Sequence, residues 1–572
     1  MTEAPSVARR RTEAGWRRLA TPVWVARFVL LVGVVTVVSA LIPAVRGRTE
    51  LLAGLVPAVF PAAATTGAAA VGLVLITLSG GLRRGKFRAW LLATVLTAIS
   101  VVLHLVKGLD VEEAVLAVAL FVLLLVARPR FTARPDPRSL NRVAGVLVLG
   151  TLTATFLGWL WLLFVARGEP SRISPVLLLG ESALGLVGIP GPVHFVNAEQ
   201  AEHASVALAV LGGSVLVLAV LTALAPADGP HALTADEAGF LRKLLVRWGS
   251  SDSLAYFALR DDRSLLVAPS RRAAISYRVV GTVSLSAGDP LGEPAAWPEA
   301  IDAWLAEARS YGWVPAVLAA SERGAEAYHR AGLDALELGD EALLSADEFS
   351  LEGRKMRGVR QAVSRCERAG LSVTCRRLRD MSPEEIRAVD AKADQWRDGE
   401  VERGFSMALG RFGEPADGEA VVVLSTDRDG ELKGLLHLVP WGDDGLSLDL
   451  MRRDRDSENG VIEQMVATLM TRAPSLGVRR VSLNFAVFRN VFARGERLGA
   501  GPVLRLWRSL LLVASRWWQI ESLYRANAKY QPEWAPRFLC FRAAGDLPRV
   551  SVAALRAEAF IVAPGWVRRF YR

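Results

Sequence analysis

The chain has 572 residues, 52% of them hydrophobic, and its mean hydropathy of +0.29 excludes a protein that lies wholly in water. A formal net charge of +10 indicates an anionic partner, such as lipid headgroups or nucleic acid. Three cysteines are too few for a disulfide framework, and without a CxxC pair or an HExxH helix the sequence predicts no metal site and no cofactor.

Long apolar runs fill the first 227 residues. A helix needs roughly 20 residues to cross about 30 Å of hydrocarbon, and five runs approach that length, at residues 23–45, 51–81, 89–106, 143–165 and 204–225. A shorter run at residues 114–127 supplies a sixth span. The sequence therefore predicts an α-helical transmembrane domain of about six helices over residues 1–227, whose first span is too long for a cleavable signal peptide.

Arginine and lysine are concentrated in alternate loops of this domain. They precede the first span, and they separate the second span from the third and the fourth from the fifth, whereas the other loops carry fewer. Because short loops rich in Lys and Arg stay in the cytoplasm, both ends of the domain are expected to be cytoplasmic. This predicts a multi-pass protein of the cell membrane in which the part after residue 227 is cytoplasmic.

A stretch rich in Gly and Pro at residues 171–196 is too broken for a simple span. We expect a loop on the outer surface of the bundle, with a re-entrant segment as the alternative. His104 and Glu181 are polar groups in apolar surroundings, so each is a functional candidate against the alternative of an ordinary interhelical hydrogen bond.

From residue 228 onward, predicted strands alternate with helices of 10 to 18 residues, which indicates α/β organisation. Residues 276–321 and 434–486 look like two copies of one unit, in which a strand, a polar turn, a helix and a returning strand follow one another. Asn459 opens the helix of the second copy, where the helix N-terminus favours an anion. The preceding RRDRDSENG lacks the glycine spacing that a pyrophosphate cofactor needs, so we expect a different ligand.

The end of the chain is strongly basic. Residues 479–572 hold 17 Arg and Lys against 5 Asp and Glu, whereas residues 228–478 hold 31 against 42. Residues 505–518 hold three arginines and three tryptophans among apolar residues, which favours an interfacial helix near a bilayer, with a core helix as the alternative.

Several separated motifs resemble the phosphatidylglycerol lysyltransferase (multiple peptide resistance factor) family. They are SLDLMRRDRDSENGVIEQMV, VSLNFA, SLYRANAKYQPEWAPRFL, VSLSAGDPLGEPAAWPEAI, GRKMRGVRQAVSRCERAGL and GFSMALGRF. The resemblance implies a cytosolic tandem GNAT-like α/β domain, with a first repeat at residues 228–380 and a catalytic second repeat, including the basic end, at residues 381–572. Because the family's separate flippase bundle and the synthetase fused to some relatives have no counterpart here, we interpret the chain as a short form with the synthase half only.

The resemblance also implies the activity. We expect transfer of an amino acid, with lysine as the first candidate, from aminoacyl-tRNA to phosphatidylglycerol at the cytoplasmic membrane face, which alters the surface charge of the membrane and confers resistance to antimicrobial peptides. The alternatives are transfer to another lipid or to a non-lipid acceptor, and a non-catalytic lipid-translocating or scaffold protein. The amino acid, the lipid and homo-oligomerisation stay open.

Such a transfer exchanges one ester for another, so it needs no metal but does need a carboxylate and cations that bring two anionic substrates together. The resemblance places Asp449 at the family's essential aspartate, Arg452 beside it and Lys529 at a substrate-site lysine. We expect Asp449 to bind the α-ammonium group, with a role as general base as the alternative, and the two cations to hold phosphate or oxyanion. His329 and His437 are interpreted as ordinary hydrogen-bonding residues. The further candidates for substrate binding are Glu402, Phe405, Ser406, Asn459, Asn484, Tyr524, Asn527 and Tyr530.

Overall fold

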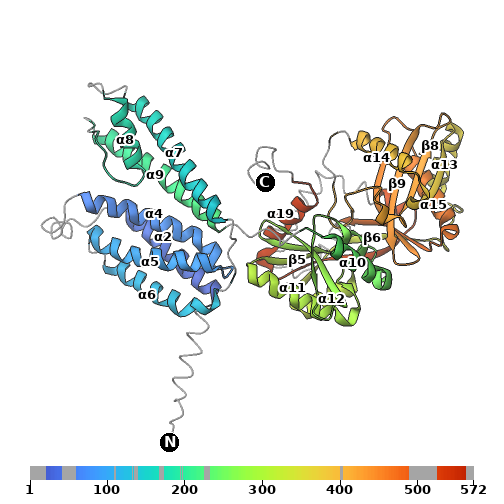
Figure 1. Cartoon of the computed structure of the whole chain (residues 1–572), viewed down its shortest axis with the longest axis horizontal. Helices are drawn as coiled ribbons and strands as arrows, with labels where there is room; N and C mark the ends of the chain where they lie inside the picture. Colours follow the sequence, from blue (N-terminus) through green and yellow to red (C-terminus); the bar gives the residue numbers. More distant parts are fainter. Residues whose placement is uncertain are drawn as a thin grey trace, which may run out of the picture. The chain divides into compact units, whose positions relative to one another are not determined.

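A computed structural model describes residues 21–41, 59–108, 111–131, 133, 139–166, 173–193, 195, 198–224, 232–397, 399, 403–487 and 525–561. The chain divides into two compact units, a helical unit within residues 1–227 and an α/β unit that holds almost all of residues 228–572 (Figure 1). The predicted order of an apolar helical bundle followed by an α/β domain is therefore confirmed.

Seven apolar helices form the described part of the helical unit. They are α2 (Pro22–Leu41), α4 (Val59–Leu82), α5 (Phe87–Gly108), α6 (Val111–Ala127), α7 (Ser139–Val165), α8 (Pro175–Gly185) and α9 (Ala198–Ala223). Six of them overlap the six predicted apolar runs. By length and composition three stretches of the described residues are long and apolar enough to cross a membrane, namely Pro22–Ser39, Leu140–Val165 and Gln200–Ala223.

Helix α8 corrects the expectation of a loop at residues 171–196. Pro175 occupies the first turn of α8, where its fixed φ suits a helix, and the apolar run that follows continues the helix to Gly185. The carboxylate of Glu181 accepts a hydrogen bond from the backbone N–H of Val193 at 2.9 Å, which folds the Gly- and Pro-rich turn back onto α8. The side chain of His104 lies outside the described residues.

Small residues let the helices of this unit approach closely. A Cβ atom on Gly33 of α2 would lie 2.9 Å from the carbonyl oxygen of Gly72 of α4, and the reverse contact would be 2.8 Å. Large apolar side chains point outward instead, as on α7, where Leu152 is 64% exposed and Phe164 is 69% exposed. Such a broad apolar exterior suits a lipid environment.

The α/β unit is built on one continuous sheet of twelve strands. They are β1 (Ser264–Val267), β2 (Ala273–Val280), β3 (Val283–Ala287), β4 (Leu291–Gly292), β5 (Val314–Ala320), β6 (Asp334–Ser345), β7 (Ser372–Arg377), β8 (Val421–Thr426), β9 (Leu432–Trp441), β10 (Gly445–Arg453), β11 (Arg480–Val487) and β12 (Glu533–Phe541). Their order is β1-β2-β3-β5-β12-β6-β11-β10-β9-β8-β7, with β4 paired to β2. We call the part from β1 to β5 the first half and the part from β7 to β11 the second half.

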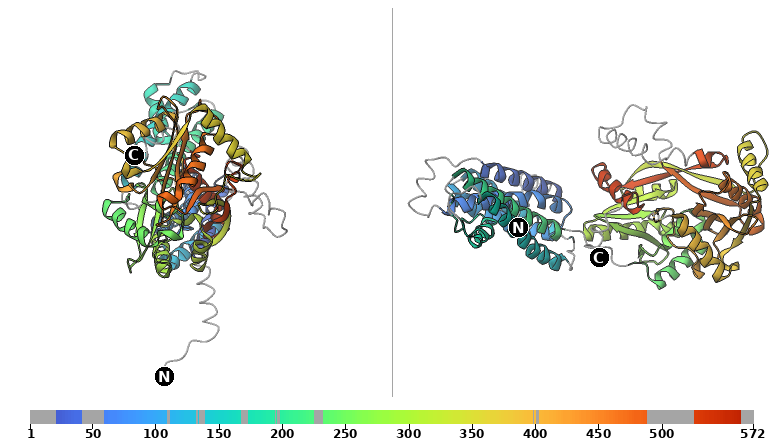
Figure 2. Two further views of the ribbon diagram at one scale, coloured as in Figure 1. Left: turned by 90° about the vertical axis from the view of Figure 1, so that its right-hand side faces the viewer. Right: turned by 90° about the horizontal axis from the view of Figure 1, so that it is seen from above.

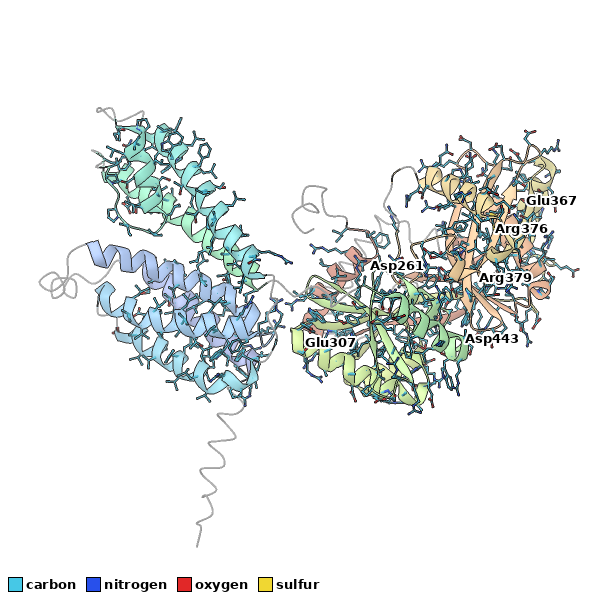
Figure 3. All side chains as sticks on the ribbon, in the orientation of Figure 1. Asp261, Glu307, Glu367, Arg376, Arg379 and Asp443 are labelled. Atoms are coloured by element: carbon cyan, nitrogen blue, oxygen red, sulfur yellow. The ribbon has the colours of Figure 1, made fainter. Side chains whose placement is uncertain are left out.

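Helices cover both faces of this sheet (Figure 2). They are α10 (Ala235–Trp248), α11 (Trp297–Tyr311), α12 (Glu322–Arg330), α13 (Arg357–Ala369), α14 (Pro383–Arg397), α15 (Val461–Arg472) and α19 (Leu547–Ala557). In the second half, α13 and α15 pack on one face through Val359 and Met465, and α14 packs on the other through Val389. Arg376 of the edge strand β7 and Arg379 of the turn after it are labelled in Figure 3.

The two sequence copies have the same topology. In the first half the antiparallel hairpin β2–β3 is followed by α11 and by β5, which is parallel to β3. In the second half the hairpin β9–β10 is followed by α15 and by β11, which is parallel to β10. Ala319 of β5 and Asn484 of β11, 165 positions apart, both have a left-handed backbone, with φ of +56° and +65°. The internal repeat that the sequence indicates is therefore a repeat of structure.

The halves exchange their last strands. β12, from the end of the chain, pairs antiparallel with β5 of the first half, whereas β6, which follows the first half, pairs antiparallel with β11 of the second. β6 and β12 also pair with each other at the centre of the sheet. Moreover β7 precedes the predicted boundary at residue 380 but pairs with β8, so the division into residues 228–380 and 381–572 stays a prediction.

Candidate functional site

The parallel strands β10 and β11 separate after a short paired stretch. Residues 445–447 pair with residues 480–482, and then β10 continues only along β9 while β11 continues along β6. Asn484 lies where they part, and its side-chain amide donates a hydrogen bond to the carbonyl of Leu448. The side-chain oxygen of Asn484 is buried and has no hydrogen-bond partner in the described structure. We call this point of separation the apex.

Asp449 lies at the apex in a β-bulge, because the register of the β9–β10 pair shifts between Leu448 and Leu450. Its Oδ1 accepts a hydrogen bond from the N–H of Leu409 at 2.6 Å, and its Oδ2 lies 2.7 Å from Nδ1 of His437. The side chain is 5% exposed. Both carboxylate oxygens of the predicted catalytic residue are thus engaged by the protein itself.

A loop at residues 403–413 closes over the apex. The carbonyl of Met407 accepts a hydrogen bond from the Asn484 amide at 3.4 Å. The ring of Phe412 packs edge to face on the ring of His437, with 5.0 Å between the centroids. Together with the hydrogen bond from the N–H of Leu409 to Asp449, these contacts fix the loop against β9, β10 and β11.

Phe405 and Ser406 anchor the start of this loop and do not contact the apex through any described hydrogen bond. Glu558, just after α19, accepts hydrogen bonds from their backbone N–H groups at 2.6 and 3.0 Å. The guanidinium of Arg263 lies over the ring of Phe405, and its central carbon is 4.2 Å from the centroid of that ring. Burial lowers the pKa of Arg263 to about 9. Both predicted residues are fully buried, so their described contacts hold the loop.

Asn527, Lys529 and Tyr530 come from one short segment on the other side of the apex. The amide of Asn527 donates to the carbonyl of Leu483 at 3.4 Å, next to the point where the strands part. Lys529 Nζ pairs with the Glu463 carboxylate of α15 at 2.5 Å. Burial, with this carboxylate nearby, raises the pKa of Tyr530 well above its usual value. No hydrogen bond among the described residues joins the segment to the carboxylate at the apex.

Arg452 and Asn459 lie further along the same connection. Arg452 is half-buried on β10, opposite Leu435 of β9 and three residues past Asp449. Asn459 is exposed in the turn before α15, and its backbone carbonyl accepts a hydrogen bond from Arg365 of α13 at 3.0 Å. The structure therefore brings Arg452 to the strand of the apex and leaves Asn459 at the surface.

Two predicted residues, Glu402 and Tyr524, lie outside the described residues, and so does the segment rich in Arg and Trp at residues 505–518. Their predicted roles stay predictions.

His437 is the residue that the sequence interpretation leaves out of the site. The sequence signal that could place His437 in the site is the register of the β9–β10 hairpin. Trp441 pairs with Gly445 across the turn that contains Asp443, labelled in Figure 3. The same register, carried along the hairpin, puts His437 opposite residues 449–450. A histidine facing the predicted carboxylate could thus have been found by counting from the turn.

The first half has an equivalent opening, where the parallel pairing of β3 and β5 ends at Ala287 and Leu318. This opening holds a buried charge network that the sequence interpretation also missed. Arg537 of β12 is 4% exposed, and its guanidinium pairs with the carboxylates of Asp252 at 2.7 Å and Glu341 at 2.5 Å. The hydroxyl groups of Ser253 and Ser482 donate to the other oxygen of Glu341. The network therefore joins β12, β6 and β11.

Asp289 extends this network. Its backbone N–H donates to Asp252 at 2.8 Å, and its carboxylate accepts from the N–H and the hydroxyl of Ser321 at 2.8 and 2.6 Å. Burial, with the Asp252 carboxylate adding to it, raises the pKa of Asp289 to about 7. Both oxygens of each of the three carboxylates have partners in the described structure, so internal pairs close this opening.

The described ranges hold no group of three His, Cys, Asp or Glu side chains placed to bind a metal ion. Burial raises the pKa of Cys375 to about 11 and that of Cys540 to about 12. Neither thiol is therefore a thiolate nucleophile near neutral pH.

Comparison with known proteins gives matches over most of the chain. Residues 242–541 match the family described as "Phosphatidylglycerol lysyltransferase, C-terminal", and residues 17–224 match the family described as "Transmembrane region of lysyl-tRNA synthetase". The "Lysylphosphatidylglycerol biosynthesis bifunctional protein LysX" of Rhodococcus opacus is 45% identical over 507 residues, which cover 87% of this chain and 45% of that protein. The protein of the same name from Mycobacterium avium is 45% identical over 503 residues, which cover 86% of this chain and 42% of that protein.

The chain thus spans less than half the length of these relatives. Among solved structures, L-PGS from Bacillus licheniformis is similar, with a TM-score of 0.51, 22% sequence identity, and coverage of 58% of this chain and 99% of that one. This last likeness shows a shared fold.

Proposed function

The chain belongs to the phosphatidylglycerol lysyltransferase family, and we propose that it transfers an amino acid, with lysine as the first candidate, from aminoacyl-tRNA to phosphatidylglycerol at the cytoplasmic face of the membrane. The name of the curated relatives, which refers to lysylphosphatidylglycerol, supports this choice of amino acid and lipid. The product would make the membrane surface less negative, because lysine adds positive charge to an anionic headgroup.

The observation that carries the proposal is the apex, where β10 and β11 separate and place Asp449 and Asn484 at their point of separation. The same chain has apolar helices able to cross a membrane. One ester is exchanged for another in this reaction, so the protein has to orient the two substrates, accept a proton from the glycerol hydroxyl and stabilise an oxyanion. Asp449 supplies the carboxylate for this chemistry, and Arg452 and Lys529 supply the cations.

Helix α13 supports an anionic substrate that comes from water. Arg357, Arg365 and Arg368 are exposed on it, and Glu367, labelled in Figure 3, is its one acidic residue. The carbonyl of Asn459, in the turn that leads into α15, is held by one of these arginines. A polyanion such as the acceptor end of a tRNA suits a surface of this charge.

We also propose that the helical unit spans the membrane several times and that the α/β unit is cytoplasmic, because charged tRNA is found there. A reporter fused after Arg138 or at the C-terminus is expected to behave as cytoplasmic, and one fused near Gly168 as external. An external C-terminus would contradict the proposal. Homo-oligomerisation stays open, and cross-linking in membranes tests it.

Mass spectrometry of lipid extracts tests the activity. Cells that make no aminoacylated lipid are expected to accumulate lysylphosphatidylglycerol when they express the full chain. Cells that express the Asp449→Asn variant at an equal level in the membrane are expected to lack it. A different acylated lipid would favour the alternative acceptor, and no new lipid at all would favour the non-catalytic alternatives.

A further inference from the structure

Asp449 at the apex forms a buried pair with His437, a residue that has no role in the function as proposed so far. The histidine is on β9 and the aspartate on the adjacent strand β10, with 2.7 Å between Nδ1 and Oδ2. The side chains are 1% and 5% exposed. The two side chains therefore form a buried pair and not an ion pair at the surface.

The surroundings of Asp449 fix the proton on one nitrogen of His437. The other carboxylate oxygen already accepts the N–H of Leu409 at 2.6 Å. An ionised carboxylate only accepts hydrogen bonds, so Nδ1 of the imidazole is the donor. In the neutral ring the second nitrogen, Nε2, then carries a lone pair and is a base.

Nε2 of His437 is buried and has no hydrogen-bond partner in the described structure. Buried polar atoms without a partner are rare, and each one needs an explanation. The three buried carboxylates of the first half show the contrast, since each of their oxygens is paired inside the protein. The missing partner of Nε2 has to be a hydrogen-bond donor, and a hydroxyl group is such a donor.

The location of Nε2 fits an incoming substrate. His437 packs against Phe412 of the loop at residues 403–413, and the same loop contacts Asn484, whose buried side-chain oxygen also has no partner among the described residues. The loop therefore lies over two hydrogen-bond acceptors that lack donors, Nε2 of His437 on β9 and the side-chain oxygen of Asn484 on β11. Asp449 lies on β10, the strand between them.

We propose that His437 is the general base of the transfer reaction and that Asp449 is a positioning residue that holds its tautomer. This rests on the proposed function. Nε2 takes the proton of the lipid hydroxyl while the hydroxyl oxygen forms a bond to the ester carbonyl carbon of the aminoacyl group. When the bond between that carbon and the ribose oxygen breaks, the imidazolium returns the proton to the ribose oxygen. The proton is thus conserved, and no co-reactant is needed.

His437→Asn in the full chain tests this. The asparagine amide can take the place of Nδ1 and keep the hydrogen bond to Asp449, but it has no equivalent of Nε2. We expect kcat to fall at least about 100-fold, as for the loss of a general base, with both KM values within about threefold of wild type and an unchanged thermal transition. His329→Asn is the matched control, because His329 bonds only to the nearby carbonyl of Leu333 in the described structure, and we expect its kcat to be unchanged.

A folded His437→Asn protein with a kcat near that of wild type would overturn the proposal and leave the pair a structural one. If this variant does not fold, His437→Gln, which also lacks a base, carries the same test. The wild-type rate in D2O under single-turnover conditions is a further measurement, and we expect a decrease of about twofold or more; an unchanged rate would overturn the proposal. If wild type itself makes no aminoacyl-lipid, the proposed function fails instead, so the two failures are distinct.

Discussion

The two halves of the α/β unit have the same topology and fill their strand openings in different ways. In the first half Arg537, brought in on β12, neutralises Asp252 and Glu341, and both oxygens of each carboxylate are paired. In the second half Asp449 is paired too, but the imidazole it holds keeps an unpaired nitrogen. The same opening thus serves to join the halves in one copy and is available for chemistry in the other.

Strand exchange explains the difference. β12 comes from the end of the chain and lies between β5 and β6, so its arginine enters the first opening. A buried charge network of this kind holds elements together only while every member is present. We therefore expect substitutions in the first half to change stability and substitutions in the second half to change activity.

Arg537→Met removes the cation of the first network. Two buried carboxylates then lose their partner, and breaking a buried ion pair costs about 3–5 kcal/mol. We expect a loss of this size in the free energy of unfolding, measured by thermal or denaturant unfolding of the full chain in detergent. Arg330→Met, at an exposed pair with Glu326, is the control and is expected to change it by about 0.5 kcal/mol or less. A loss under about 1 kcal/mol at Arg537 would contradict the importance of the network.

Asp289→Asn tests the same network through pH. The pKa of Asp289 is raised by burial and by Asp252 from 3.8 to about 7, so the folded protein binds a proton that the unfolded chain releases between these pH values. Its stabilising contribution is present below about pH 4 and is lost as pH rises through about 7, by at most about 4 kcal/mol.

The asparagine variant imitates the protonated carboxyl, so we expect it to match wild type near pH 4 and to be more stable near pH 8. Unfolding curves at the two pH values measure this. A variant less stable than wild type at pH 8 would show that the charged carboxylate is the favoured form.

Lys529→Ala probes the segment before β12, which pairs with α15 of the second half. The side chain is 39% exposed, so its pair with Glu463 contributes little to stability. If Lys529 holds substrate phosphate or oxyanion, we expect kcat/KM to fall about tenfold to 100-fold, equivalent to about 1.4–2.7 kcal/mol. Lys392→Ala, at the pair with Glu431, is the matched control and is expected to have wild-type kcat/KM. Equal effects of the two substitutions would remove Lys529 from the site.

Salt gives the smallest expected effect. If α13 neutralises two tRNA phosphates, doubling the salt concentration from about 50 to 100 mM raises KM for aminoacyl-tRNA by about 3.5-fold. We expect a smaller change in KM for the lipid. Arg357→Gln together with Arg368→Gln is expected to reduce the salt dependence, whereas Arg330→Gln on α12 of the first half is expected to leave it unchanged. The same salt dependence for both substrates would contradict separate binding surfaces.

Local patterns in the sequence were enough to predict the helices of the first unit and the repeat in the second. An apolar run of about 20 residues has one stable form in a membrane, and strand, turn, helix and strand follow from neighbouring residues. Helix α8 was missed because Gly and Pro around it indicate a loop. The pairing of β12 with β5 was not predictable, since more than 200 residues separate the partners and no local pattern specifies such a contact.

For the site, the resemblance pointed to Asp449, and the structure supplies what surrounds it. Phe405 and Ser406 were predicted to bind substrate, but their described contacts go to Glu558 and Arg263, which are distant in sequence. His437 was missed although it lies only twelve residues from Asp449, because its role depends on a hairpin register.

The transfer assay with two Asp→Asn variants tests the central claim most directly. Purified full-length protein is mixed with phosphatidylglycerol vesicles and lysyl-tRNA that carries labelled lysine, and the label in the lipid is counted. We expect wild type and Asp289→Asn to transfer lysine at similar rates, and Asp449→Asn, folded as judged by its thermal transition, to be at least about 100-fold slower. Transfer at the wild-type rate by folded Asp449→Asn, or loss of transfer in Asp289→Asn alone, would contradict the assignment of chemistry to the second half.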